Sequence, residues 1–193
     1  AGAKRSREGR IKYKGESFLP KSPKHAISRG IAYCSDDRKL DGLFLGRPIV
    51  ENLSAPALSA ISKRGLIKHD KERSLALSNA SKFTIDTSRL DNEAGVLSGG
   101  NQQKVALGKW LAIEPNVILV NEPTRGVDVG ARAEIYGKLR ELANEGAAVI
   151  FASTDIQEIN GLADRVISFY RGMQVGELQS AAISPASVLE QIT

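Results

Sequence analysis

The spacing of apolar residues changes along this chain, and its C-terminal part shows a regular alternation. Short continuous apolar runs are typical of buried strands, and they alternate with segments whose apolar residues fall on one helical face. Ile135, Leu139 and Leu142 form one such face. Strands are predicted at 117–120, 148–152, 166–170 and 173–178, and helices at 130–144, 156–163 and 184–192.

The N-terminal part predicts smaller elements. A short edge strand with a turn is expected at 9–17, and a strand at 31–34. Between them, Ser22 is placed to cap a helix that starts at Pro23 and ends at Gly30.

The middle of the chain predicts a helix-rich region. Charged residues and glycines favour a loop at 36–46, and the pattern over 48–112 is mostly helical. Residues that interrupt this helical pattern are Pro56, Gly65 and Gly95.

Alternating strands and helices predict an α/β fold with a parallel sheet. We expect 1–47 and 114–193 to form parts of this α/β core, and 48–113 to form a helical subdomain inserted between them. Ligands of such sheets bind at the carboxyl ends of the strands, where Asn121 and Glu122 fall.

Composition narrows the class of protein. The 193 residues can bury one sizeable core, and 41% hydrophobic and 25% charged residues are ordinary for a globular domain. No apolar run approaches the length of a membrane span, and no secretory leader is expected. The single cysteine, Cys34, excludes an internal disulfide and a cysteine-based zinc site, and its apolar neighbours predict a buried thiol. His25 and His69 lie in polar stretches and are predicted to be surface residues.

The net charge of +5 comes with two basic clusters. Basic clusters can bind nucleic acid or an anionic membrane surface. Aromatic residues do not interleave these charges as they do in stacking platforms, which favours solvated faces. The clusters are Lys4, Arg5, Arg7, Arg10, Lys12 and Lys14, then Lys63, Arg64, Lys68, Lys71 and Arg73.

The segment 97–104 carries the strongest chemical signal. It places Ser98 and two glycines directly before a predicted helix. Glycines allow close approach of a ligand, and the N–H groups and dipole at a helix start favour an anion. Downstream, an apolar strand ends in Asn121 and Glu122. A candidate phosphate-binding segment is thus followed by a carboxylate at the end of a strand. This combination suggests nucleotide chemistry.

These two segments resemble the signature and Walker B motifs of ABC-type ATPases. Leu-Ser-Gly-Gly-Asn-Gln-Gln-Lys occupies 97–104, Glu-Pro-Thr-Arg-Gly-Val-Asp-Val-Gly-Ala occupies 122–131, and Asp-Asp-Arg-Lys occupies 36–39. The set is most similar to the second ATPase half of carbohydrate importers of the ribose, galactose and xylose type. The resemblance runs over about 9–178 and implies an ABC ATPase sheet of the P-loop NTPase fold, with the signature on the helical subdomain.

The resemblance assigns roles to individual residues. ABC halves work in head-to-tail pairs, so the signature of one half closes over the ATP that the other half holds. Glu122 corresponds to the general base that activates water, and Asp128 to the D-loop, where it also suits an N-cap for the next helix. The residues that would contact the partner's ATP are Ser98, Gly99, Gly100 and Gln102.

Three positions depart from the general ABC pattern. Relatives usually have Asp at Asn121, where the carboxylate holds Mg²⁺ through water, and an amide loses the charge that favours this hard cation. Asp36 stands at the Q-loop position, where a glutamine normally links the metal to the membrane subunit. Thr154 stands at the position of the switch histidine, and its hydroxyl cannot carry a charge. We expect weak magnesium binding and poor catalysis at this half's own site.

No segment matches Gly-x-x-x-x-Gly-Lys-Ser/Thr, the Walker A loop that cradles nucleotide phosphates. The chain therefore resembles a second ATPase half that lacks its N-terminal portion, with an incomplete sheet. The resemblance implies ATP and Mg²⁺ as cofactors and leaves open whether the chain alone binds them. Hydrolysis by the chain alone is not expected.

Three functional hypotheses remain. The first is the ATP-hydrolysing component of a sugar importer, which works with a second ATPase half and membrane permeases at the cytoplasmic face of the plasma membrane. The second is a catalytically inert module that acts through protein contacts. The third is a nucleic-acid ATPase, which lacks support because neither a long coiled coil nor zinc-binding cysteines are present.

Overall fold

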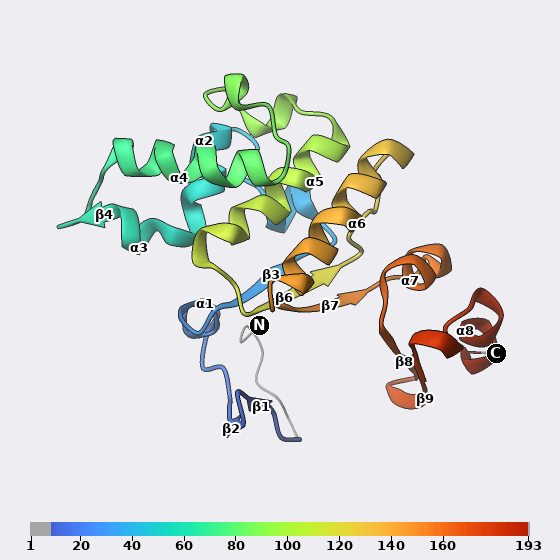
Figure 1. Ribbon diagram of the computed structural model, residues 1–193. Coiled ribbons are helices and arrows are strands. Elements are labelled where there is room, and N and C mark those ends of the chain that lie inside the picture. Colours follow the sequence, from blue (N-terminus) through green and yellow to red (C-terminus); the bar gives the residue numbers. More distant parts are fainter. Residues whose placement is uncertain (1–8, 193) are drawn as a thin grey trace. The chain divides into compact units, whose positions relative to one another are not determined.

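The computed structural model describes residues 9–192, and this part of the chain divides into two compact units, 9–151 and 152–192 (Figure 1). Lys4, Arg5 and Arg7 of the first basic cluster lie outside the described residues. Within the described part of the chain, every helix is too short or too polar to cross a membrane.

The first unit begins with a small hairpin and a capped helix. Strands β1 (Lys12–Tyr13) and β2 (Glu16–Ser17) pair antiparallel, and α1 (Pro23–Ser28) follows. The Ser22 hydroxyl accepts a hydrogen bond from the His25 N–H, as the cap prediction requires. His25, predicted to be a surface residue, is partly exposed, and its ring lies 5.6 Å from the ring of Phe18.

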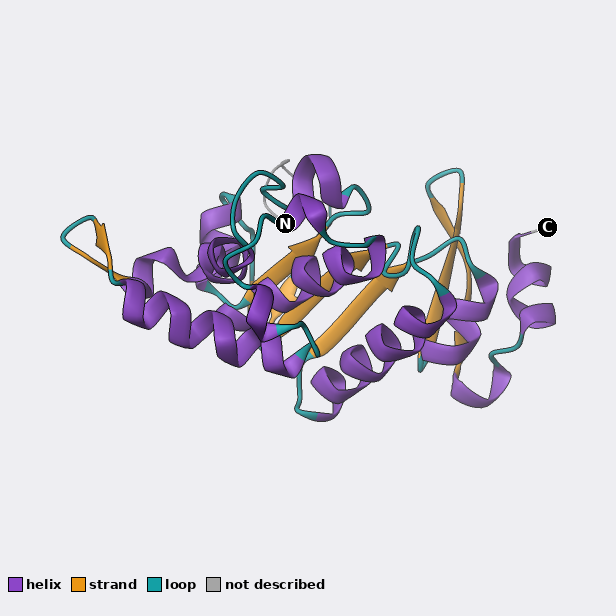
Figure 2. Ribbon diagram, turned by 90° about the horizontal axis from the view of Figure 1, so that it is seen from above, coloured by secondary structure: helices purple, strands orange, loops and turns teal. Residues whose placement is uncertain are grey.

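A three-stranded sheet forms the centre of this unit. Its strands are β3 (Ile31–Cys34), β6 (Val117–Asn121) and β7 (Ala148–Ala152), in the order β3-β6-β7. Figure 2 shows them side by side. β3 and β6 are parallel, with Ile31 opposite Val117 and Cys34 opposite Val120. The carboxyl ends of these two strands therefore meet at one edge, which brings 35–38 close to 121–126.

Helix α6 (Val129–Asn144) begins just beyond that edge. Asp128 caps it by accepting a hydrogen bond from the Ala131 N–H at 3.0 Å. Ile135 and Leu139 are fully buried, as the apolar spacing predicts. Gly146, at φ 99°, ends the helical segment in a conformation that favours glycine.

The middle of the chain is largely helical, as predicted, with two differences. The predicted loop 36–46 contains a π-helical turn at Arg38–Gly42, and the interruption at Gly65 is a small hairpin of β4 (Ser62–Lys63) and β5 (Leu66–Ile67). Its α-helices are α2 (Ile49–Ser54), α3 (Leu58–Ile61), α4 (His69–Lys82) and α5 (Gly99–Gly108). Short 3₁₀ turns occur at Ala55–Ala57, Thr87–Arg89, Ala94–Val96 and Lys109–Ile113.

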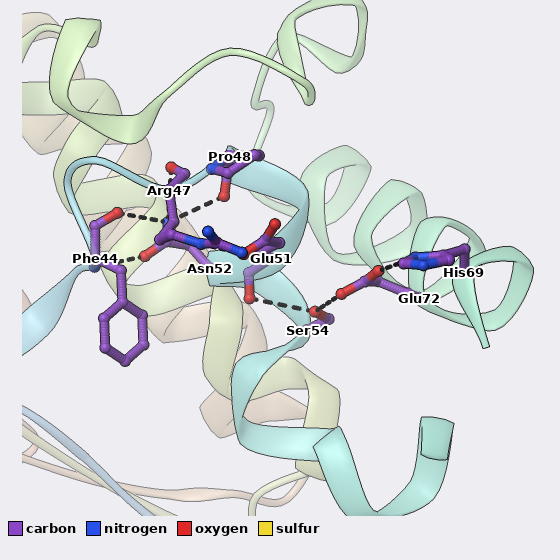
Figure 3. A network of polar contacts seen from close by, with 8 residues as sticks. All are labelled: Phe44, Arg47, Pro48, Glu51, Asn52, Ser54, His69 and Glu72. Carbon is purple, nitrogen blue, oxygen red and sulfur yellow. Dashed lines mark hydrogen bonds and ion pairs between the residues drawn. The ribbon is translucent and has the colours of Figure 1, made fainter. Parts of the chain in front are cut away.

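Buried polar side chains hold this region together (Figure 3). Asn52 is 1% exposed, accepts a hydrogen bond from the Phe44 N–H, and donates to the carbonyl oxygens of Phe44, Arg47 and Pro48. One amide thereby fixes the turn that enters α2. Nearby, the Ser54 hydroxyl donates to the buried Glu72 carboxylate. The other Glu72 carboxylate oxygen lies 3.1 Å from Nδ1 of His69, whose exposed side chain agrees with the prediction.

The second unit combines a hairpin with two helices. Strands β8 (Arg165–Tyr170) and β9 (Met173–Gln179) pair antiparallel, close to the predicted bounds. Helix α7 (Ile156–Leu162) precedes them, and a 3₁₀ turn (Ser180–Ala182) leads to α8 (Pro185–Ile192), which packs on the hairpin. The Ser184 hydroxyl accepts a hydrogen bond from the Ser187 N–H, as expected of a cap.

Candidate functional site

The start of α5 presents a polar, exposed surface. Ser98 caps this helix, and its hydroxyl accepts a weak hydrogen bond from the Asn101 N–H at 3.5 Å. The Ser98 side chain is exposed. The open N-terminus of a ten-residue helix and an exposed hydroxyl therefore coincide at one place.

The two glycines that follow Ser98 lie where neighbouring atoms leave no room for a side chain. A Cβ at Gly100 would lie 2.8 Å from Cβ of Ala131, and one at Gly99 would lie 2.9 Å from both Nη2 of Arg38 and the carbonyl oxygen of Gly126. Gly100 is buried against the first turn of α6, while Gly99 is partly exposed. The glycines thus allow α5 to pack closely on its neighbours.

Two glutamines of α5 point into the protein. The Gln102 amide is buried and donates to the carbonyl oxygens of Ala94 and Gly95, at 3.4 and 3.5 Å. Its side chain therefore supports the turn before the signature and is not presented at the surface. The buried Gln103 amide donates to the Pro123 carbonyl at 2.8 Å, so it ties α5 to the loop that follows β6.

That loop, 122–128, is tightly turned. Glu122 has φ 49°, a left-handed conformation that is uncommon outside glycine and often marks functional positions. Gly126 is also left-handed, at φ 65°. Asp128 lies at the end of the loop, where its carboxylate caps α6 and faces Gly100.

Asp36, Asn121 and Arg125 form a hydrogen-bonded cluster at the sheet edge. The Asn121 amide donates to Oδ1 of Asp36 at 2.9 Å, and Nη1 of Arg125 pairs with Oδ2 of Asp36 at 3.0 Å. The three side chains come from the ends of β3 and β6, which parallel pairing brings together. Sequence spacing placed Asp36 and Asn121 in two separate motifs, and the structure brings them into direct contact.

Arg38 makes a second bridge to the same loop. Its Nη1 and Nη2 atoms donate to the carbonyl oxygens of Arg125 and Gly126, at 2.7 and 3.3 Å. Within residues 9–192, its buried Nε atom has no hydrogen-bond partner. Neither Arg38 nor Gln103 is among the predicted site residues. Arg38 is part of the Asp-Asp-Arg-Lys motif and Gln103 is part of the signature. Their place in these motifs is the sequence feature that could have marked them as site residues.

The arrangement does not fit a magnesium ion. Both carboxylate oxygens of Asp36 accept hydrogen bonds from nitrogen, and Asn121 turns its amide nitrogen toward Asp36. Across the described residues, no three side chains of His, Cys, Asp or Glu cluster in a way that could hold a metal. A hard divalent cation would have to displace the Arg125 guanidinium and the Asn121 amide from the Asp36 carboxylate.

Thr154 belongs to the second unit. Its side chain is exposed, and it lies just before the cap of α7, where the Asp155 carboxylate accepts hydrogen bonds from the N–H groups of Gln157 and Glu158. The structure thus places Thr154 on a turn between β7 and α7.

Comparison with known proteins agrees with the motifs. The model of a family described as ABC transporter matches residues 1–125. The chain belongs to the ABC transporter family. Relatives named ribose import ATP-binding protein RbsA include one from Jannaschia sp. (strain CCS1), 44% identical over 92% of this chain and 34% of that protein. Another, from Bacillus subtilis (strain 168), is 38% identical over 100% of this chain and 39% of that protein. This ABC transporter chain spans little more than a third of the length of such relatives.

Solved structures establish the fold. A nucleotide-free ATP-binding cassette from an ABC transporter superimposes with a TM-score of 0.78 at 20% identity, over 93% of this chain and 72% of that one. A dimeric post-hydrolysis cassette bound to ADP and phosphate gives 0.75 at 22% identity, over 91% and 75%. The predicted α/β fold of ABC ATPase cassettes is therefore confirmed.

Proposed function

We propose that this chain is part of the ATP-hydrolysing component of a carbohydrate ABC importer. In this proposal it contributes its signature to a composite ATP site whose phosphate loop lies on a second ATPase half. The observation that carries the proposal is the exposed Ser98 hydroxyl at the open N-terminus of α5. Relatives named for ribose import support a sugar as the cargo.

Ser98 and the N–H groups at the start of α5 would bind the partner's triphosphate. Gly99 and Gly100 serve by letting this helix approach its neighbours, and Gln102 by fixing the turn before it. This division of labour explains why the four signature residues differ in exposure although all belong to one motif.

The chain's own nucleotide site is proposed to be catalytically poor. Glu122 remains as the carboxylate that orients or deprotonates the attacking water. Asp36 and Asn121 bind each other, and Thr154 cannot carry the charge of a histidine. We assign this chain to the second half of its importer because 36–39, 97–104 and 122–131 match that half's motifs.

The partners follow from this assignment. A second ATPase half would supply the phosphate loop, and we assign no residue of this sequence to that loop. Membrane permeases would carry the sugar. The protein would lie peripherally on the cytoplasmic face of the plasma membrane. The helical region 48–113 would carry the signature, and 1–47 and 114–193 would form the α/β core.

Replacement of Ser98 in the assembled importer tests the proposal. Ser98→Arg places a long charged side chain where the partner's phosphates would lie, and should abolish ATP-driven sugar uptake. Ser78→Arg is a matched control, because Ser78 is an exposed residue of α4 and should tolerate arginine. Unimpaired uptake by the Ser98→Arg importer would contradict the role of the signature.

The competing proposal is a catalytically inert module. ATP hydrolysis by the purified chain, measured alone and after addition of the partner half, separates the two. We expect no turnover alone, and stimulation of the partner half that requires Ser98. Binding to the partner without any effect on its turnover would favour the inert module.

A further inference from the structure

The Arg38 guanidinium occupies a slot between two glycines. Its Nη2 atom lies 2.9 Å from the position that a Cβ of Gly99 would take, and 3.5 Å from that of Gly126. The slot therefore accepts the guanidinium because position 99 has no side chain, whereas a Cβ at position 126 would make an ordinary contact with Nη2. Gly42 is also close to Arg38. A Cβ built on Gly42 would lie 3.1 Å from Cβ of Arg38, so the absence of a side chain there leaves room for the arginine.

The same guanidinium ties three separate segments together. It starts from the turn after Asp36, donates to the carbonyl oxygens of Arg125 and Gly126, and fills the space that a side chain on Gly99, the first residue of α5, would need. The Arg125 side chain returns to Asp36, which closes a ring of contacts. The segment around Asp36, the loop after Glu122 and the signature are thereby fixed relative to one another.

We propose that Arg38 is a positioning residue that sets the place of the signature relative to the loop carrying Glu122 and Asp128. It acts on ATP through Gly99 and Ser98, without touching the nucleotide itself. The inference rests on the proposed function, because it assigns Arg38 to the same composite site. This role would also explain why an arginine stands third in the Asp-Asp-Arg-Lys motif.

The task requires a guanidinium, not merely a charge. Arginine offers parallel N–H donors in a rigid plane, which suits two adjacent carbonyl oxygens and a narrow slot. Lysine offers a compact ammonium group, which lacks the flat fork of donors that spans the two carbonyl oxygens. Arg38→Lys should therefore behave like Arg38→Met, although it keeps the charge.

Steady-state ATP hydrolysis by the assembled importer tests the inference. Arg38→Met and Arg38→Lys should raise the KM for ATP roughly tenfold and change kcat less than twofold, because a displaced signature binds the partner's ATP less well. Lys39→Met is the matched control, since Lys39 is an exposed cation on the same turn, and its KM should stay as in the wild type.

Gly99→Ala tests the packing of Arg38 against Gly99 by changing the glycine instead of the arginine. The added methyl group would push Arg38 and the Gly126 carbonyl away, so it should raise KM by a similar factor. The double variant Arg38→Met/Gly99→Ala should show less than the product of the two single effects, since both displace the Arg38 guanidinium from Gly99 and only the clash with the Gly126 carbonyl is separate. Independent effects that multiply would overturn the inference.

Chemical rescue separates positioning from general folding. In Arg38→Ala, millimolar guanidinium chloride should enter the empty slot and lower the KM for ATP, while sodium chloride at equal ionic strength should not. An unchanged KM in Arg38→Met and Arg38→Lys, with Ser98→Arg still inactive, overturns the role of Arg38 and leaves the proposed function standing. An active Ser98→Arg importer would instead remove the proposed function itself.

Discussion

The Asn121 amide donates a hydrogen bond to the Asp36 carboxylate across 2.9 Å. An aspartate at position 121 would place a second carboxylate opposite Asp36 at hydrogen-bond distance. Two carboxylates this close repel each other unless a cation or a proton lies between them. The amide removes that repulsion and, at the same time, the need for a cation.

Asn121→Asp should therefore create a cation requirement. The variant loses a hydrogen bond and gains a repulsion, which should cost about 1–3 kcal/mol of stability at neutral pH. Magnesium should restore part of this loss by binding between the two carboxylates. Thermal unfolding with and without MgCl₂ measures both effects, and the wild type should show no shift.

Asn121→Ala is the control, because it removes the same hydrogen bond without adding charge. It should be destabilised and insensitive to magnesium. If Asn121→Asp also melts at the same temperature with and without magnesium, the two carboxylates do not form the expected cation site.

Much of the fold could be predicted because local signals agree with tertiary structure. Ser22, Pro23 and Gly30 mark α1 from sequence, and the apolar runs of β3 and β6 mark buried parallel strands. Within 48–112, the hairpin at Gly65 escaped prediction because its strands have two residues each and expose Leu66 and Ile67. The π-helical turn at Arg38–Gly42 was missed because Asp37 and the backbone contacts that form it leave no periodic pattern.

The motifs identify the candidate site residues, but they do not predict which of these residues contact one another. Ser98, Asn121 and Asp36 stand out in the sequence, yet the hydrogen bond between Asp36 and Asn121 depends on the parallel pairing of strands far apart in the chain. Arg38 could not be assigned because its partners are backbone carbonyls, which sequence does not distinguish.

Gly100 should be intolerant of any side chain. A methyl group there would lie 2.8 Å from Cβ of Ala131, so α5 and α6 would have to separate. Gly100→Ala should cost about 1–3 kcal/mol through overpacking, measured as the free energy of unfolding in urea.

Gly137 offers the matched glycine. It lies in the middle of α6, and apart from the neighbouring residues and backbone of that helix, no described atom comes within 4 Å of a Cβ built there. Gly137→Ala should raise stability by about 0.5–1 kcal/mol, since alanine favours the helix. Equal effects of the two substitutions would show that close packing at Gly100 does not matter.

Asn52 should be essential for the turn that enters α2. Its buried amide makes hydrogen bonds with the backbone of Phe44, Arg47 and Pro48. Asn52→Ala would leave the Phe44 N–H without its acceptor, while the three carbonyl oxygens each keep a backbone N–H donor. We expect a loss of about 1–3 kcal/mol in urea unfolding, the cost of one orphaned group together with the lost hydrogen bonds of the amide.

Asn101→Ala is a suitable comparison for Asn52→Ala. Asn101 lies in the first turn of α5, and its side chain is less buried than that of Asn52. A loss below about 0.5 kcal/mol is expected there, as for most surface substitutions. Asn52→Ala with an equally small loss would contradict the structural role of the amide.

Cys34 should make the protein less stable in alkali. Burial raises the pKa of its thiol from 9.0 to about 11, although the nearby charges of Lys109 and Arg38 lower it. Between these values the unfolded chain has released the thiol proton and the folded chain retains it. Stability from this group is complete below pH 9.0 and is lost as the pH rises toward about 11.

Burial also lowers the pKa of Lys109 from its usual 10.5, which acts in the opposite direction, so the total pH profile is not the useful measurement. The difference between wild type and Cys34→Ala reports the thiol together with its coupling to Lys109, because titrating groups that do not interact with Cys34 cancel. In urea unfolding, the advantage of the wild type should shrink by roughly 2–3 kcal/mol across the window from 9.0 to about 11. Parallel profiles for the two proteins would mean that the thiol ionises as readily in the folded chain as in the unfolded one.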